Sequence, residues 1–168
     1  SALIDQALAE AQGLLATDPA NPYFLELAGQ VLLESGKPEQ ALPYLREATE
    51  RSGSQPLIAA MFGHALIATE DPARFAEAEG VLKAAVARDR LNPFAWYQLG
   101  MVYAARGDLP RARLASAEQQ VMNRRYPEAL RSAQAAENGL ERGTPDWIRA
   151  QDIALQARAE LERMRERN

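Results

Sequence analysis

A period of about 34 residues runs through most of this chain of 168 residues. It is marked by two series of small residues whose successive members lie 34 or 37 positions apart. The series are Ala7, Ala41, Ala78 and Ala112, and Gly29, Gly63 and Gly100. Both contain the same three-residue excess, which places an insertion between Ala68 and Ala76. A repeat of this length predicts a stack of similar supersecondary units, each burying its apolar face against its neighbours.

Proline and glycine divide each period into two helices. A capping side chain followed by proline, which suits the first helical position, marks four helix starts. These are Asn21-Pro22, Asp71-Pro72, Asn92-Pro93 and Thr144-Pro145. Gly36 and Gly107 are typical of the left-handed residue that closes a helix. We therefore predict an all-α chain of about nine helices, at 3–17, 22–35, 38–52, 55–69, 72–88, 93–106, 109–123, 126–141 and 145–165.

Small residues at matching positions predict close helix crossings. A glycine on the first helix of a unit lets the second helix approach because no Cβ intervenes, and an alanine on the second helix is its small partner. We expect Gly100→Leu to damage folding, since overpacking a tight crossing costs about 1–3 kcal/mol. The residues expected in the core of the units are Gly29, Ala41, Gly63, Ala78, Trp96, Leu99, Gly100, Tyr103 and Ala112.

The unit that starts at Asn92 resembles a known repeat. It has Trp96, Leu99-Gly100, Tyr103, a Gly107-Asp108 turn and Ala112, a pattern similar to the tetratricopeptide repeat. The resemblance implies a right-handed superhelix of antiparallel helix pairs in a single domain, 1–168. Its parts are the second helix of a truncated repeat at 2–21, repeats at 22–54, 55–91 (with the insertion) and 92–123, an overlapping degenerate repeat at 109–141 and a capping helix at 145–168.

The expected capping helix carries an apolar stripe at alternating steps of three and four residues. Its members are Trp147, Ala150, Ala154, Ala157, Leu161 and Met164. We expect this stripe to pack on the preceding helices, because the opposite face of the helix is charged. A strip that binds a partner is the alternative interpretation.

The composition leaves little room for catalysis. There is no Cys and only one His, His64, which excludes thiolate chemistry and the usual two-His zinc site. Phosphate-binding and dinucleotide-binding glycine loops and the nucleophile elbow are also absent. We predict no enzyme activity and no catalytic, cofactor-binding or metal-ligating residue in this chain. The longest apolar run, 57–62, is far shorter than the ~20 residues of a transmembrane helix, so no membrane span is expected.

Charge is distributed unevenly along the chain. Residues 1–89 carry six basic and 13 acidic side chains, whereas residues 90–168 carry 13 basic and 10 acidic ones, and those 13 are all arginine. A solvated helical surface accounts for this distribution, and a groove with a charge preference is the alternative. A nucleic-acid partner is not expected, because the isoelectric point is about 5.2.

First helices of stacked pairs line a concave groove, and helical spacing projects which residues face it. The candidate binding residues are Tyr23, Glu26, Gln30 and Glu34, then Leu57, Ala60, His64 and Ile67, then Phe94, Tyr97, Met101 and Ala105. This lining is acidic toward the first repeat and apolar toward the third, which suits a peptide with aromatic anchors. A neighbouring domain or the chain's own ends filling the groove is an open alternative. His64 is either a polar groove residue or part of a partner site.

Three pieces of sequence point to a narrower family. They are 21–27 with 34–38, 92–96 with 114–118, and 143–153. These pieces resemble the C-terminal repeat region of bacterial periplasmic zinc metalloproteases of the BepA-like type, in its alphaproteobacterial versions. The resemblance implies a periplasmic parent protein in which an HExxH peptidase domain, with its zinc, precedes the repeats. It also implies that the repeats dock on that domain or recruit substrates or outer-membrane assembly partners.

The peptidase motif itself is absent from this chain, so the resemblance assigns it no catalytic residue and no cofactor. Because the repeats open on a second helix, we expect the chain to be a piece of a longer protein. The alternative function is a stand-alone tetratricopeptide adaptor or scaffold with an unrelated partner. Under both interpretations the expected partner is a protein or peptide.

Overall fold

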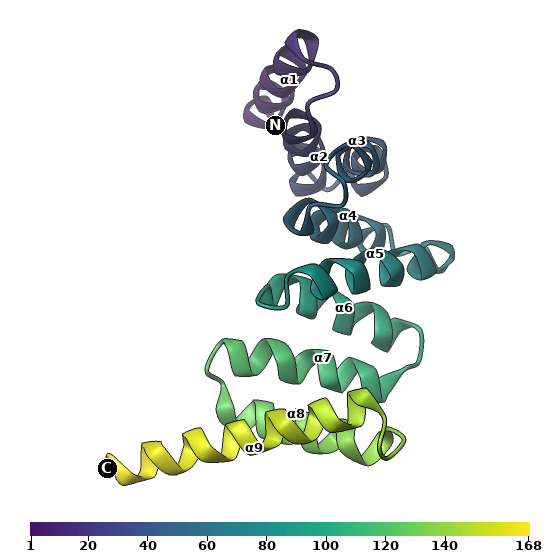
Figure 1. The fold of residues 1–168 in the computed structure, drawn as a ribbon. Helices are drawn as coiled ribbons and strands as arrows, with labels where there is room; N and C mark the ends of the chain where they lie inside the picture. Colours follow the sequence, from purple (N-terminus) through teal and green to yellow (C-terminus); the bar gives the residue numbers. More distant parts are fainter. The chain divides into compact units, whose positions relative to one another are not determined.

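The computed structural model describes residues 1–168 and contains nine α-helices and one short 3₁₀ helix, with no strand (Figure 1). The helices are α1 (Ala2–Thr17), α2 (Pro22–Glu34), α3 (Pro38–Arg51), α4 (Pro56–Ala68), η1 (Pro72–Arg74), α5 (Phe75–Arg88), α6 (Pro93–Ala105), α7 (Leu109–Met122), α8 (Tyr126–Gly139) and α9 (Pro145–Glu166). The prediction of an all-α chain is confirmed, and the predicted helix ends agree within two residues except at the start of α5.

Local capping explains this agreement. The Asn21 side chain accepts a hydrogen bond from the backbone N–H of Tyr23 at 2.9 Å, and Asn92 caps α6 in the same way. Gly36 and Gly107 have φ angles of 79° and 83°, in the left-handed region where glycine closes a helix. Each of these signals lies within a few residues of the helix end that it sets.

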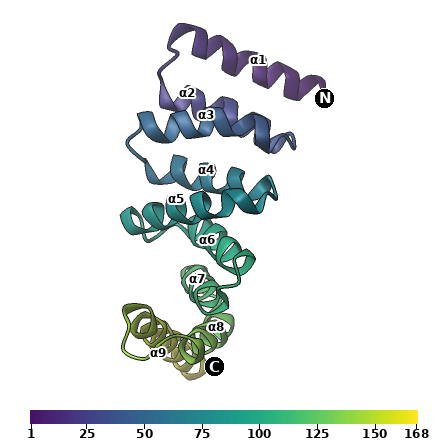
Figure 2. The same cartoon turned by 90° about the vertical axis from the view of Figure 1, so that its right-hand side faces the viewer.

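The helices form two compact units, an N-terminal unit of Ser1–Asp89 and a C-terminal unit of Arg90–Asn168. In the N-terminal unit each of α1 to α4 packs against the next helix in the chain, and Figure 2 shows them side by side. Leu25 of α2, Ala48 of α3 and Ile58 of α4 are buried together, with Leu15 and Tyr44 packed against them. The unit is therefore built from contacts between neighbouring helices, as in a repeat stack.

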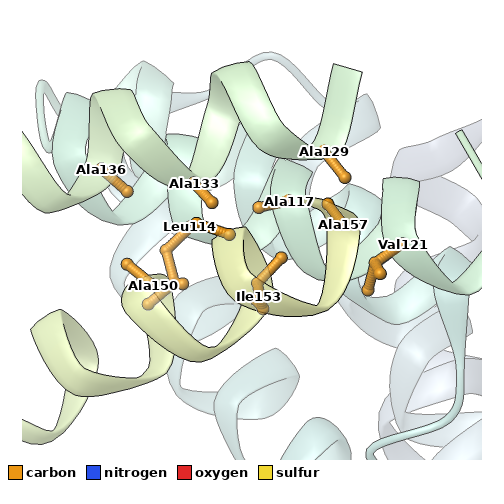
Figure 3. Close-up of a cluster of buried hydrophobic side chains, with 10 residues drawn as sticks. Leu114, Ala117, Val121, Ala129, Ala133, Ala136, Ala150, Ile153 and Ala157 are labelled. Atoms are coloured by element: carbon orange, nitrogen blue, oxygen red, sulfur yellow. The ribbon is translucent and has the colours of Figure 1, made fainter. Parts of the chain in front are cut away.

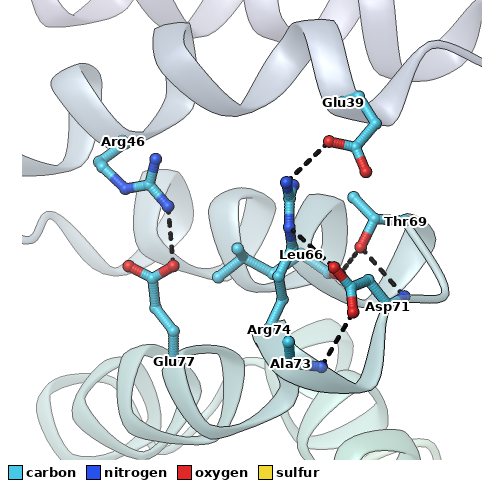
Figure 4. Close-up of polar contacts among 8 residues, drawn as sticks. All are labelled: Glu39, Arg46, Leu66, Thr69, Asp71, Ala73, Arg74 and Glu77. Atoms are coloured by element: carbon cyan, nitrogen blue, oxygen red, sulfur yellow. Dashed lines mark hydrogen bonds and ion pairs between the residues drawn. The ribbon is translucent and has the colours of Figure 1, made fainter.

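The three-residue insertion is accommodated between α4 and α5. Glu70 has a left-handed conformation, with φ of 58°, and the chain then forms η1. Arg74 of η1 contacts Glu39 of α3 at 2.8 Å and Asp71 at 3.6 Å (Figure 4). The helix predicted at 72–88 therefore begins three residues later than expected, since residues 72–74 form a separate turn that is held against α3.

The glycines of the first helices differ in their surroundings. A Cβ on Gly29 would lie 2.6 Å from Cγ and Cδ2 of Leu45, and one on Gly63 would lie 2.5 Å from Cγ of Leu82, so both positions need glycine. The close neighbour is thus a leucine rather than the expected alanine. A Cβ on Gly100 would meet no atom closer than 3.5 Å. The predicted close approach of the second helix is confirmed at Gly29 and Gly63. At Gly100 the expected partner Ala112 is a near neighbour, with its backbone oxygen 3.5 Å from such a Cβ, so a methyl group fits and the effect of the larger Gly100→Leu change stays a prediction.

In the C-terminal unit, α7 packs against α6, α8 and α9, and α8 packs against α9. Ten buried residues of α7, α8 and α9 form its core, and seven of them are alanine (Figure 3). They are Leu114, Ala117, Val121, Ala129, Ala133, Ala136, Ala150, Ile153, Ala154 and Ala157. Because alanine has no side chain beyond Cβ, the three helices approach one another closely.

The predicted apolar stripe on α9 is buried only over its central part. Its three alanines are buried, whereas Trp147 and Leu161 are half-buried. Met164 is 52% exposed, so the prediction is wrong at this position. The reason is length: α9 has 22 residues against 14 in α7 and in α8, and its last turns extend past them (Figure 1). Ile153, which the stripe omitted, is fully buried.

None of the helices combines the length and the hydropathy that a transmembrane segment requires. No group of three or more His, Asp and Glu side chains lies close enough together to hold a metal ion.

Candidate functional site

Helix α6 separates its apolar residues onto two faces. The buried face carries Trp96, Leu99 and Val102. On the other face, Tyr97 is 52% exposed and Met101, four positions later, is 46% exposed. Residues four apart on a helix lie one above the other, so these two large side chains form a single exposed patch.

An open pocket lies beside this patch, where α6 meets α7. It has a volume of about 290 Å³ and is lined by eight residues of the two helices. They are Tyr97, Gly100, Met101, Ala104, Leu109, Ala112, Arg113 and Ser116. Most of this lining is apolar, and the exposed side chains of Tyr97, Met101 and Leu109 surround small residues.

Arg113 is the one charged residue in the pocket lining. It takes part in no ion pair or side-chain hydrogen bond of the structure. The neighbouring Arg111, by contrast, is bonded to Asp108 at 2.9 Å and to Asp146 at 3.1 Å. These hydrogen bonds raise the pKa of Arg111 above its ordinary value. The positive charge available to a ligand in the pocket is therefore that of Arg113.

Comparison with known proteins identifies the repeat. The model of the tetratricopeptide repeat matches residues 3–56 and 61–121, which together make up more than half of the chain. The chain belongs to the tetratricopeptide-repeat family. Proteins with tetratricopeptide repeats (TPRs) bind other proteins, and the match ends before α8 and α9.

Solved structures of TPR proteins have the same fold. The crystal structure of MamA is similar with a TM-score of 0.66 and 21% sequence identity, over 97% of this chain and 91% of that one. The crystal structure of TTC0263, a thermophilic TPR protein in Thermus thermophilus, gives a TM-score of 0.55 at 22% identity, over 90% of this chain and 91% of that one. No curated protein matches the sequence. At these identities the likeness concerns the fold.

The predicted binding residues on the TPR first helices fall in different places. Tyr97 and Met101 are brought together in the α6–α7 pocket, whereas Phe94 and Ala105 are not part of its lining. Ala60 of α4 is completely buried and therefore lines no open surface, so the expectation that it faces the groove is wrong. The remaining candidates lie on α2 and α4. They are Tyr23, Glu26, Gln30, Glu34, Leu57, His64 and Ile67.

The candidates on α2 form a polar strip with one exposed aromatic residue. Tyr23 projects into solvent, and Gln30 Nε2 donates a hydrogen bond to Glu34 Oε1 at 2.9 Å. Burial raises the pKa of Glu26 above its ordinary value, because removal of water disfavours the carboxylate. On α4, His64 and Ile67 are half-buried, while Leu57 is exposed. A role in binding stays a prediction for all of these residues.

Sequence reasoning missed the α7 side of the pocket, because the TPR groove was projected from first helices alone. Leu109, Arg113 and Ser116 all come from the second helix of the repeat. The fixed separation in sequence between the first and second helices of one repeat would have identified these positions on α7.

A second polar cluster was also missed. Glu118 of α7 is 1% exposed, and its carboxylate accepts hydrogen bonds from Arg149 of α9 at 2.6 and 3.1 Å and from Arg90 at 3.0 Å. The pKa of Arg149 is raised, first by its hydrogen bond to Glu118. The Arg90 carbonyl in turn accepts a hydrogen bond from Trp96 Nε1 at 2.8 Å. This cluster connects helices of the unit to one another and lies outside the pocket lining.

Proposed function

We propose that this TPR domain binds a protein partner through the α6–α7 pocket. The observation that carries the proposal is an open apolar pocket bordered by exposed Tyr97 and Met101 and by the unpaired Arg113. Tyrosine and arginine are enriched among the residues that dominate binding energies at interfaces. Methionine is flexible enough to adapt its shape to a bound side chain.

The binding partner is proposed more narrowly from the sequence resemblance. The pieces at 92–96, 114–118 and 143–153 support a parent of the BepA-like zinc metalloprotease type, located in the periplasm. In that parent the chain docks on the peptidase domain or recruits substrates or outer-membrane assembly partners. The zinc ion would belong to the peptidase domain and not to this chain. A stand-alone TPR adaptor is the second candidate, supported by the repeats that cover most of the sequence.

The coding region upstream of Ser1 distinguishes the two candidates. An HExxH segment behind a secretory signal would support the protease parent. Further repeats or a different domain would overturn it in favour of the adaptor.

Peptide selection tests the binding surface itself. Peptides selected from a displayed random library on the wild-type chain should lose at least tenfold in affinity, about 1.4 kcal/mol, for the double variant Tyr97→Asp/Met101→Asp. The matched control is Ile148→Asp/Leu155→Asp, which places the same charges on exposed apolar residues of α9 in the same unit. Equal affinities for the wild type and the α6 variant, with circular dichroism showing both folded, would overturn the proposal.

A further inference from the structure

The pocket over Gly100 occupies the place where the other two repeats have a leucine side chain. Gly29 is covered by Leu45, 16 positions later, and Gly63 by Leu82, 19 positions later, the extra three being the insertion. The residue 16 positions after Gly100 is Ser116. Its Oγ would lie 3.8 Å from a Cβ on Gly100, whereas the leucine carbons come within 2.5 to 2.6 Å of the other two. The third repeat therefore keeps the glycine but lacks the side chain that fills the space above it.

The space over Gly100 is large enough to take an aliphatic side chain. Its volume is about 290 Å³, at the lower limit of the ~300–1,000 Å³ of sites for drug-sized ligands. Gly100 and Ala112 form its small-residue part, and Met101 and Leu109 are its aliphatic neighbours. An aliphatic side chain inserted here would be removed from water on several sides, which is where its burial is favourable.

Charge complementarity specifies what should lie next to that side chain. Arg113 lines the pocket and has no acidic partner within the chain, whereas Arg111 is paired with Asp108 and Asp146. An arginine in this state favours a carboxylate that approaches with the ligand. The C-terminal unit as a whole also carries 13 arginines against 10 acidic residues.

We infer that the pocket receives a leucine-sized aliphatic side chain of a partner protein whose neighbouring residue is acidic. The partner's leucine would cover Gly100 as Leu45 covers Gly29, and its carboxylate would pair with Arg113. This inference rests on the proposed function and adds the chemistry of the partner segment.

Methyl NMR with short peptides tests the inference, because it detects weak binding. The probe is acetyl-Asp-Leu-Asp amide, titrated into chain labelled at the methionine methyl groups. The Met101 signal should shift saturably. Met164, which is similarly exposed but lies on α9, should not shift. Acetyl-Asp-Ala-Asp amide should bind about tenfold more weakly or worse, because it buries three fewer carbon atoms.

Two variants separate the two parts of the site. Ser116→Leu restores the residue found in the other repeats, so the chain should stay folded while the peptide no longer shifts Met101. Arg113→Gln should weaken the binding of acetyl-Asp-Leu-Asp amide about two- to fivefold, the range for an exposed ion pair. The variant should then bind acetyl-Asp-Leu-Asp amide no more tightly than acetyl-Lys-Leu-Lys amide. The matched control is Arg131→Gln, which removes a likewise exposed arginine of α8 outside the pocket.

Equal binding of the Leu and Ala peptides, or unchanged binding by a folded Ser116→Leu variant, would overturn the inference. So would a Met101 shift that depends on protein concentration without peptide, because a second copy of the chain would then fill the pocket. If Ser116→Leu does not fold, the affinities of the Leu and Ala peptides and the effect of Arg113→Gln still test the inference. The proposed function is tested separately, by the peptides selected from the random library. It still stands after any of these failures if those peptides require Tyr97 and Met101, and it is overturned if they do not.

Discussion

Gly29, Gly63 and Gly100 stand at equivalent positions of three repeats. An added methyl group would nevertheless clash at Gly29 and Gly63 and fit at Gly100. At Gly29 and Gly63 an added Cβ would overlap the branched carbon of a fully buried leucine, which cannot move aside without disturbing its own packing. At Gly100 the same Cβ would make ordinary van der Waals contact with α7, at 3.5 Å or more from every atom. Packing therefore requires glycine at Gly29 and Gly63, whereas alanine would also fit at Gly100.

Alanine substitutions measure this difference. Gly29→Ala should lower the free energy of unfolding by about 1–3 kcal/mol, as overpacking does. Gly100→Ala should be neutral or raise it by up to about 1 kcal/mol, because alanine has the higher helix propensity. Denaturation in guanidinium chloride measures both values. Equal losses at the two positions would show that the surroundings of Gly100 are as tight as those of Gly29.

Glu26 gives a pH-dependent prediction. Burial raises its pKa in the folded state above the ordinary 4.5, so the folded chain holds this proton more strongly than the unfolded chain does. The contribution of Glu26 to stability is thus fully present below pH 4.5 and is lost as the pH rises through the folded-state pKa. Glu26→Gln should therefore be more stable than the wild type at pH 7, and the difference should disappear near pH 4.

Unfolding in urea at the two pH values gives the comparison for Glu26→Gln. Glu50→Gln, at an exposed position of α3, is the control for loss of one negative charge from the same unit. A stability difference between Glu26→Gln and the wild type that stays the same at pH 4 and pH 7 would contradict the titration of Glu26 as its cause.

Single residues also show what the sequence can and cannot predict. Trp96 and Gly29 were assigned to the core because the repeat register alone places them there, and both are buried. The pocket was not predicted, since it depends on which side chain of α7 stands over Gly100. That side chain, Ser116, has no distinctive property until it is compared with Leu45 at the matching position of another repeat.

Between helices, the C-terminal unit combines an alanine-rich contact with one buried charge cluster. The alanines of α7, α8 and α9 allow close approach but bury little side-chain surface each (Figure 3). The Glu118 carboxylate adds directional bonds from α7 to α9 through Arg149. Their positions, 31 residues apart, gave no sequence signal, because a contact between two helices depends on how they are packed. Helix ends were predictable because their capping residues are local.

Removing Arg149 tests the contribution of that cluster. Arg149→Gln should lower the free energy of unfolding by about 1–3 kcal/mol, the cost of leaving a buried polar atom without a hydrogen-bond partner. The atom is Glu118 Oε1, which is bonded to Arg149, whereas Arg90 bonds to Oε2. The control is Arg163→Gln, which removes an exposed arginine paired with the half-buried Glu160 of the same helix and should cost less than about 0.5 kcal/mol. Thermal and chemical denaturation measure both variants. Equal effects would mean that the buried cluster adds nothing to stability.

Over the whole chain, the two compact units are each held together by contacts between neighbouring helices. Stability in such proteins is a sum of local terms, so that a destabilised repeat opens without unfolding distant ones. The repeat period predicted this kind of organisation. The division at Asp89 was not predicted, because the repeat pattern continues across that position.

Amide hydrogen exchange can detect this local behaviour. Gly29→Ala should lower protection in α2 and α3 and leave α8 and α9 unchanged. Arg149→Gln should lower protection in α8 and α9 and leave α2 and α3 unchanged. Exchange followed by mass spectrometry, with peptides that cover both units, would show the pattern. A uniform loss of protection along the chain in either variant would mean that the molecule unfolds as one cooperative body.

Leu45 and Leu82, which cover Gly29 and Gly63, indicate how a binding pocket can be created in another repeat of the chain. One shortened side chain, Leu45→Ser, would open over Gly29 a cavity of the kind found at Gly100, at the expense of core packing. The residues equivalent to Tyr97 and Arg113 are Glu26 and Leu42 at Gly29, and Ala60 and Glu79 at Gly63, so a new cavity at either glycine would select basic rather than acidic neighbours. A chain with repeated glycine–leucine contacts thus holds positions at which one shortened side chain would open a binding cavity.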